Sequence, residues 1–192
     1  MQKETVGIIF NGPPGSGKDT ACEYLHRAYQ ARYLSFKQEL YNIAATVAGV
    51  SLKLMVSLAT DRSTKEVPNK LFVLGGVQVS PRNWLIYVSE NVVKPLLGSD
   101  YFGKQAASRV QPGVNVFSDG GFAEEALCIN DVCDRLVIVT LHKDGCTFEG
   151  DSRRYFDQDF LLRHDIDWIP IENNGSIEDL YEELDKLMCF VI

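Results

Sequence analysis

The stretch NGPPGSGKDT, residues 11–20, decides the fold of this 192-residue chain. It fits the phosphate-binding pattern G-x-x-x-x-G-K-[ST] through Gly12, Gly17 and Lys18. Glycines let backbone N–H groups turn inward around phosphate oxygens, the following helix presents its positive end, and the lysine adds a mobile charge. The pattern has one departure, because Asp19 stands where a serine or threonine is usual. The stretch therefore predicts a phosphate-binding loop with an altered metal-binding position.

The residues on both sides of this loop have the patterns that it requires. ETVGIIF, residues 4–10, is short, β-branched and apolar, as a buried strand is. After the loop, apolar residues recur at helical spacing, at Ala21, Tyr24, Leu25 and Ala28. A strand, a loop and a helix in this order are expected to bind the phosphates of ATP. The residues predicted to do so here are Gly12, Pro13, Pro14, Gly15, Ser16, Gly17, Lys18, Asp19 and Thr20.

A divalent cation, Mg²⁺, is expected beside the phosphates. The hydroxyl that usually binds it is replaced by the carboxylate of Asp19, and the next residue, Thr20, is a hydroxyl. Asp19 therefore approaches the metal directly or through water, or it leaves this role to Thr20.

Composition limits the class of protein. A length of 192 residues with 45% hydrophobic residues suits one domain with a packed core. The net charge of −7 argues against a broad, sequence-independent grip on nucleic acid, although it leaves a local basic patch open. The five cysteines are odd in number and lack C-x-x-C spacing, which favours reduced thiols in the cytoplasm. The N-terminal apolar run is too short for a membrane span, so we expect no membrane partner.

Four further strands are predicted. They are ARYLSF (31–36), GVNVFSD (113–119), DRLVIVTLH (134–142) and IDWIPIE (166–172). Because helical segments lie between most of them, the sequence predicts an α/β fold with a parallel sheet covered on both faces. The long middle, residues 37–112, has no strong strand signal and is predicted to be a helical insertion. Its helices are expected at Gln38–Ala48, from Ser80 to before Pro95, and from Asp100, with a flexible break at Gly75 and Gly76.

The last helix has the clearest boundary signal. Ser176 is its expected N-cap and Asp179 stands at the capping-box position. The buried stripe is predicted to comprise Ile177, Leu180, Tyr181, Leu184 and Met188.

Candidate catalytic residues follow the third strand. Ligands of open parallel sheets collect at the carboxyl ends of the strands, where Ser118 and Asp119 lie. Asp119 is expected to hold metal-bound water or to accept a proton from an incoming hydroxyl, or alternatively to cap the next helix. Phe122 is either a platform on which a base stacks or part of the core.

Two more polar segments are candidates. DGCTFEGDSRRYFDQDF follows the fourth strand and carries Arg153 and Arg154. It is either a mobile lid, about residues 144–158, that brings positive charge to a transferring phosphoryl group, or a solvated loop. The turn Asn173, Asn174 and Gly175 could also read the edge of a base. Arg82 is either a surface residue or a contact at the mouth of the insertion.

Together these residues resemble the P-loop nucleoside and nucleotide kinases, and most of all the bacteriophage deoxynucleoside monophosphate kinases. The matching segments are GSGKDT, SPR (80–82), DYFGK (100–104) and the terminal strand, Asn-Gly turn and helix. The resemblance spans nearly the whole chain.

The resemblance implies a three-layer P-loop NTPase fold, with a five-stranded parallel sheet in which the strand ending at Asp119 lies beside the loop strand. It implies a single domain, residues 1–192, with a core of 1–36 and 113–192 and an acceptor-binding insertion of 37–112. ATP and Mg²⁺ are the implied cofactors, with the adenine at residues 173–175. The implied reaction transfers the γ-phosphoryl group to a pyrimidine-type deoxynucleoside monophosphate.

The implied roles of individual residues complete this hypothesis. Lys18 and Asp119 are catalytic with the lid residues Arg153 and Arg154. The expected metal-binding residues are Asp19, Thr20 and Asp119. The residues expected to contact the acceptor are Lys37, Arg82 and Phe122. If the gene belongs to a phage, the expected location is the host cytoplasm. A homodimer is left open.

One departure from the family keeps a second acceptor open. Such kinases carry an arginine soon after the third-strand aspartate to hold the acceptor phosphate, whereas this chain reads Asp119, Gly120, Gly121, Phe122. Lys37 or Arg82 compensates, or the acceptor is the hydroxymethyl group of 5-hydroxymethyluracil, or of a related modified pyrimidine, within DNA. A glycine-opened pocket beside an aromatic residue would suit an extruded base. A third alternative is a nucleotide-dependent switch or binding module.

Overall fold

The computed structural model describes residues 4–192, so the first three residues of the predicted domain 1–192 lie outside the described residues. The chain divides into two compact units. The first unit comprises the residues up to Phe36 together with Gly103–Ile192, and the second unit comprises Lys37–Phe102. The insertion bounds 37–112 stay a prediction; Ala106 lies in the hydrophobic core of the first unit, and the partly buried Val110 packs against that core.

The sheet of the first unit confirms the predicted α/β fold. Within the described residues, five parallel strands lie in the order β2-β5-β1-β6-β7. Their bounds are Thr5–Asn11 (β1), Arg32–Leu34 (β2), Gly113–Phe117 (β5), Arg135–His142 (β6) and Asp167–Glu172 (β7). Strand β5, which leads into Asp119, pairs with β1 from Thr5 opposite Gly113 to Ile9 opposite Phe117.

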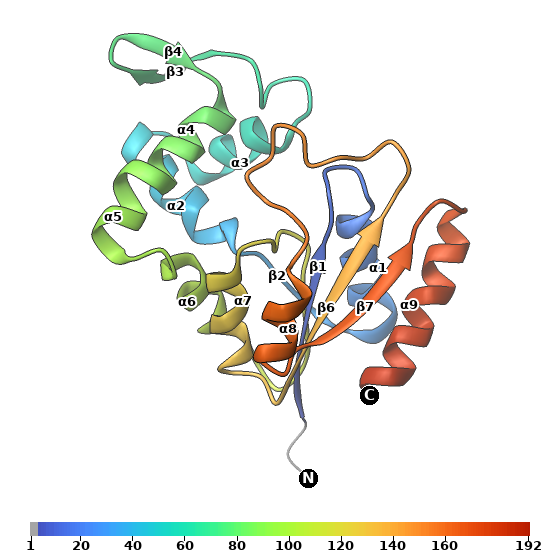
Figure 1. Ribbon diagram of the computed structural model, residues 1–192. Helices are drawn as coiled ribbons and strands as arrows, with labels where there is room; N and C mark the ends of the chain where they lie inside the picture. Colours follow the sequence, from blue (N-terminus) through green and yellow to red (C-terminus); the bar gives the residue numbers. More distant parts are fainter. Residues whose placement is uncertain (1–3) are drawn as a thin grey trace. The chain divides into compact units, whose positions relative to one another are not determined.

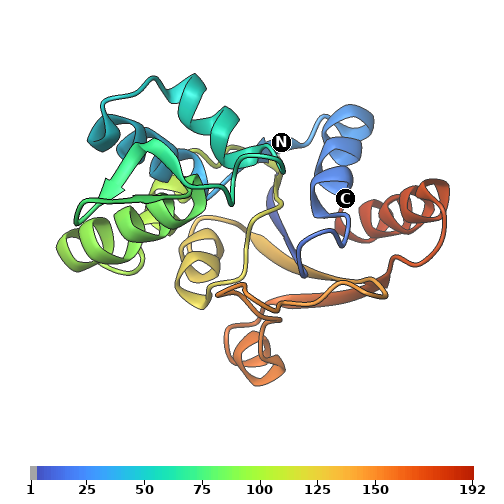
Figure 2. The same ribbon diagram turned by 90° about the horizontal axis from the view of Figure 1, so that it is seen from above.

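Helices cover both faces of this sheet (Figures 1 and 2). Helices α1 (Lys18–Tyr29) and α9 (Ile177–Val191) lie on one face. Helices α7 (Ala123–Asn130) and α8 (Gln158–Arg163) lie on the other. Helix α6, Tyr101–Ala107, contains the junction between the two units.

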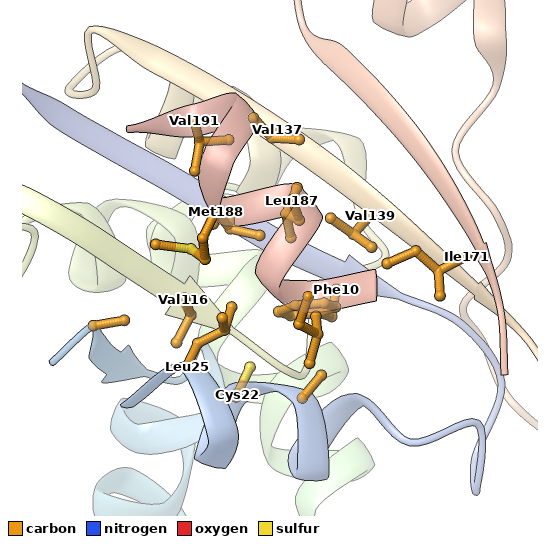
Figure 3. Packing of buried hydrophobic residues seen from close by; sticks show 14 of the residues in the cluster. Phe10, Cys22, Leu25, Val116, Val137, Val139, Ile171, Leu187, Met188 and Val191 are labelled. Atoms are coloured by element: carbon orange, nitrogen blue, oxygen red, sulfur yellow. The ribbon is translucent and has the colours of Figure 1, made fainter. Parts of the chain in front are cut away.

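Side chains of the central strand β1 point alternately to the two faces of the sheet and pack against the helices on each face. Ile8 and Phe10 of β1 pack with the residues of α1 and α9, whereas Ile9 packs on the opposite face with those of α7 and α8. Figure 3 shows the first of these clusters, in which Phe10 lies among side chains of α1 and α9 such as Leu25 and Leu187. Because both faces are buried, β1 has no polar residue from Val6 to Phe10, which is why its sequence has no polar alternation.

Helix α9 confirms the predicted capping box. The Ser176 hydroxyl accepts a hydrogen bond from the Asp179 N–H, and the Asp179 carboxylate accepts one from the Ser176 N–H. The prediction for Ile177 was wrong: it is 48% exposed because it begins the helix ahead of the turns that reach the sheet. The buried residues are Leu180, Leu184, Leu187, Met188 and Val191, and the half-buried Tyr181 stacks on Tyr24.

The second unit has its own hydrophobic core. Its helices are α2 (Lys37–Ala48), α3 (Leu52–Thr60), α4 (Pro81–Tyr87), the π-helix η1 (Val88–Val93) and α5 (Lys94–Leu97). Trp84 lies at the centre, where its indole N–H donates to the Ala44 carbonyl at 3.1 Å and its ring stacks on Phe72. The chain's second tryptophan, Trp168, belongs to the first unit, on β7, and donates to the Thr140 hydroxyl.

Two predictions for this segment were wrong. Gly75 and Gly76 are not a break but the turn of an antiparallel hairpin between β3 (Asn69–Leu74) and β4 (Val77–Val79). Both glycines have positive φ, 56° and 82°, as the tight turns of hairpins require. The helix expected to end before Pro95 instead continues through η1 into α5, where the proline stands in the first turn.

Among residues 4–192, no single helix is long and apolar enough to cross a membrane. Helices α2 and α3 meet that length and composition test only as a pair, which is bent by 114°.

Candidate phosphate-binding site

The predicted loop lies between the end of β1 at Asn11 and the start of α1 at Lys18. Gly15 and Gly17 have φ of 84° and 103°, in the left-handed region that favours glycine. Gly17 is the N-cap of α1, so the loop leads directly into the positive end of that helix. The fold thus supplies the strand, the turn and the helix terminus that anion binding needs.

Lys18 closes the loop with its side chain. Only 7% of the residue is exposed. Its ammonium donates to the carbonyl of Gly12 at 2.7 Å and to that of Pro13 at 2.6 Å. Because a cation lies beside a helix N-terminus, two positive sources act on the same small volume, which favours an anionic ligand.

Asn173, which follows β7, supports the loop. It is buried, and its side-chain amide donates to the Ser16 carbonyl at 2.8 Å. A Cβ on Gly17 would lie 2.5 Å from this amide nitrogen, so the close approach requires glycine. The neighbouring Asn174 is exposed, and its side chain accepts a hydrogen bond from the Asp144 N–H. The adenine contacts expected of residues 173–175 stay a prediction. The observed contact of the Asn173 amide is its hydrogen bond to the Ser16 carbonyl of the loop.

Asp19, the unusual residue of the motif, belongs to a hydrogen-bonded chain. The Tyr33 hydroxyl donates to the Asp19 carboxylate at 3.1 Å and lies 2.7 Å from the Ser118 hydroxyl. Burial raises the pKa of Tyr33 and the charge of Asp19 adds to this, although the hydrogen bond with Ser118 acts in the opposite direction. The phenol therefore stays protonated at neutral pH. Since its one proton goes to Asp19, the Ser118 hydroxyl donates to the phenol oxygen.

We expect Tyr33→Phe to weaken Mg²⁺-dependent nucleotide binding by about tenfold, because Asp19 loses the donor that orients its carboxylate. The measurement is titration of a fluorescent ATP analogue with and without Mg²⁺. Tyr29→Phe is the matched control, since the Tyr29 hydroxyl also donates to a carboxylate, that of Asp185 on α9. Equal affinities of the two variants in Mg²⁺ would show that Tyr33 does not position Asp19.

Asp119 follows β5 at the carboxyl end of the sheet. Its carboxylate accepts hydrogen bonds from the Ser35 hydroxyl at 2.6 Å and from the Phe36 N–H at 3.1 Å. The alternative that Asp119 caps the next helix is excluded, because the N-cap of α7 is Phe122 and has no side-chain cap bond. The carboxylate is thus held at the point where β2 and β5 both end.

The donor set fits Mg²⁺ bound together with phosphate oxygens. In the part of the chain that the structure describes, no three His, Cys, Asp or Glu side chains form a metal-binding group. Mg²⁺ in phosphoryl-transfer sites usually takes one or two carboxylates and completes its shell with phosphate and water. Burial raises the pKa of the Cys22 thiol, and the carboxylates of Asp19 and Asp119 raise it further. Both carboxylates therefore act on the same part of α1, and Thr20 lies in its first turn.

The predicted lid residue Arg153 makes a two-point ion pair. Its guanidinium donates to both carboxylate oxygens of Asp151, at 2.9 and 2.7 Å. The two side chains are only 13% and 5% exposed. Burial opposes the charge, but the hydrogen bonds and charge of Asp151, and then the charges of Asp119 and Glu125, raise the pKa of Arg153. Arg154 is exposed.

The two glycines after Asp119 are closely packed. A Cβ on Gly120 would overlap the Ile9 side chain, and a Cβ on Gly121 would lie 2.9 Å from the Cβ and Cγ of Arg153. The chain therefore has no room for a longer side chain at either position. The side chain that packs against Gly121 is that of Arg153.

The residues expected at the acceptor lie in different units. Phe122 is half-buried at the start of α7 in the first unit. Lys37 begins α2 in the second unit. Arg82, also in the second unit, pairs with Glu66 at 3.5 Å. Their contact with an acceptor stays a prediction.

Sequence reasoning missed four residues of the site: Asn11, Tyr33, Ser35 and Asp151. Asp151 had a local signal, since it stands two residues before Arg153 and such spacing allows a local turn. Asn11 also had one, because an amide at the end of a buried strand must find hydrogen-bond partners. Tyr33 and Ser35 each have a partner 85 and 84 residues further along the chain, Ser118 and Asp119, and the other partner of Tyr33, Asp19, lies 14 residues earlier; no local pattern marks these contacts.

No protein-family model matches the chain, and no curated protein matches it. Among solved structures, it is similar to shikimate kinase from Acinetobacter baumannii in complex with shikimate, at 16% identity and a TM-score of 0.47, over 98% of this chain and 94% of that one. It is also similar to TT1252 from Thermus thermophilus, at 17% identity and a TM-score of 0.48, over 99% and 100%. A sugar kinase from Janibacter is similar at 12% identity and a TM-score of 0.40, over 94% and 91%. Likenesses this distant assign neither an activity nor a substrate.

Proposed function

We propose that the protein is an ATP-dependent phosphotransferase that acts on a pyrimidine-type deoxynucleoside monophosphate. The observation that carries the proposal is the buried Lys18 ammonium, which lies across the loop at the N-terminus of α1. A cation, a glycine-rich turn and a helix terminus together form a site for the phosphates of a nucleotide. The carboxylate of Asp119 at the same end of the sheet adds a group that can accept a proton.

In this proposal each group has a defined task. Lys18 and the loop N–H groups bind the phosphates, and Asp119 orients the acceptor hydroxyl or accepts its proton. Asp19 and Thr20 would hold Mg²⁺, which when bound offsets negative charge on the phosphates. Arg153 and Arg154 offset the charge that spreads over the transferred group.

Packing at Gly120 and Gly121 favours the free monophosphate over a base within DNA. The DNA alternative requires a pocket for an extruded base at these glycines. The side chains of Ile9 and Arg153 lie against the two glycines and fill that space. Arg153, which packs against Gly121, is a charged group of the kind that binds phosphate. The net charge of −7 also argues against a long DNA contact.

The test offers ATP labelled in its γ-phosphoryl group together with free deoxynucleoside monophosphates, and separately with DNA that contains 5-hydroxymethyluracil. We expect label to appear in a pyrimidine deoxynucleotide. Label in the DNA alone would replace this acceptor by the hydroxymethyl group. Hydrolysis of ATP without any labelled acceptor would favour a nucleotide-dependent switch and reject phosphotransfer.

A further inference from the structure

Asn11 connects the loop strand to the lid segment, residues 144–158. The residue is fully buried at the end of β1, directly before Gly12. Its side-chain nitrogen donates to the Arg154 carbonyl at 3.0 Å, and its side-chain oxygen accepts from the Phe156 N–H at 3.1 Å. One amide therefore binds the backbone on both sides of Tyr155, in the way that a neighbouring strand would.

Tyr155 provides a second attachment at the same place. Its hydroxyl donates to the Leu141 carbonyl at 3.0 Å, near the end of β6. Its ring also packs against His142, with 4.5 Å between centroids. We call residues 154–156 with their partners Asn11 and Leu141 the lid anchor.

The lid anchor holds residues 154–156 against the ends of the central strand β1 and its neighbour β6. Arg154 belongs to the anchor, and Arg153 is the residue just before it. The amide of Asn11 is rigid because it is enclosed by the core and both of its polar ends are bonded. A residue held in this way fixes the starting point of the lid without touching a ligand itself.

We propose that Asn11 is a positioning residue that couples the phosphate loop to the lid, so that the lid arginines are correctly placed only while its amide holds residues 154–156. This inference rests on the proposed phosphotransfer for its effect on rate. Its structural part, the attachment of the lid, does not depend on any activity. Loss of the anchor is expected to leave the loop and Lys18 in place, because the Lys18 ammonium donates to the Gly12 and Pro13 carbonyls and the Asn173 amide donates to the Ser16 carbonyl.

The experiment compares Asn11→Ala and Tyr155→Phe with the wild-type protein. The first readout is amide hydrogen exchange in residues 144–158. We expect exchange there to be about tenfold faster in each variant, since one or two hydrogen bonds that hold the segment are lost. The second readout is turnover, which we expect to fall about tenfold to a hundredfold in Asn11→Ala, because misplacement of a positioned group by about 1 Å can have an effect of this size.

The third readout separates positioning from binding. We expect the affinity for the fluorescent ATP analogue to stay within about threefold of wild type, because the loop and Lys18 are intact. Turnover should therefore fall at saturating nucleotide. A merely structural role for Asn11 would lower the unfolding temperature without this separation.

Asn115 and Tyr29 provide matched controls within the first unit. Asn115 is also fully buried and its amide also binds backbone carbonyls, those of Gln111 and Gly113 and, at 3.4 Å, that of Val6. Asn115→Ala should lower stability as Asn11→Ala does and leave lid exchange and turnover unchanged. Tyr29→Phe is the corresponding control for Tyr155→Phe.

Each outcome decides one point. If Asn11→Ala matches Asn115→Ala in lid exchange and turnover, the proposal is wrong. If Asn11→Ala does not fold, the comparison of Tyr155→Phe with Tyr29→Phe in lid exchange tests the anchor instead. If the wild-type protein transfers no phosphate, the proposed function fails, while the exchange measurement still accepts or rejects the anchor.

Discussion

Replacement of Lys18 by alanine is expected to abolish phosphotransfer while the protein remains folded. The lysine ammonium is buried and donates to the carbonyls of Gly12 and Pro13 and, at 3.5 Å, to the Ser16 hydroxyl, all within the loop. Removal of a charge that stabilises a transferring phosphoryl group lowers turnover by at least about 10³-fold. The measurement is transfer of label from ATP to the acceptor, with circular dichroism as the check on folding.

Lys186→Ala is the control for this variant. Lys186 is an exposed lysine of α9 that pairs with Glu183. Its loss should change neither turnover nor the unfolding temperature by a measurable amount, since exposed pairs of this kind contribute little. Wild-type turnover in Lys18→Ala would remove the basis of the phosphotransfer proposal.

Asp119→Asn is expected to lower turnover by about 10²-fold or more, because the amide can neither accept a proton nor carry charge. The substitution is a clean test of charge. Asparagine keeps a carbonyl oxygen for the Phe36 N–H, and its NH₂ group can donate to the Ser35 hydroxyl, which can turn to accept. The local structure should therefore persist.

The control for Asp119→Asn is Asp185→Asn. Asp185 lies on α9, where its carboxylate accepts hydrogen bonds from the hydroxyls of Tyr24 and Tyr29. Hence both substitutions remove a charged acceptor from two donors. Steady-state turnover at saturating ATP compares them. A loss of the same size in both variants would mean that Asp119 acts through stability and has no role in the chemistry.

Local signals in the sequence predicted much of the fold. The loop, the strands of the sheet and the capping box of α9 depend on neighbouring residues, so their patterns could be read directly. The β3–β4 hairpin also had a local signal, since Gly75 and Gly76 separate two apolar runs. From the sequence, these glycines are interpreted as a break between helices, so the hairpin is not predicted.

The contacts of the candidate site could not be predicted in this way. Asp119 had two local interpretations, as a cap or as a ligand, and its observed partners Ser35 and Phe36 are more than 80 residues away in the chain. Asn11 and Phe156 are separated by 145 residues. Parallel strands bring such residues together only through long crossover connections, so no spacing in the sequence marks them.

The position of the two tryptophans gives each compact unit its own optical reporter. Trp84 lies in the core of the second unit and Trp168 on an edge strand of the first. A protein in which one of them is replaced by phenylalanine would therefore emit from a single unit. Its fluorescence during denaturation would report whether that unit melts alone or together with its neighbour.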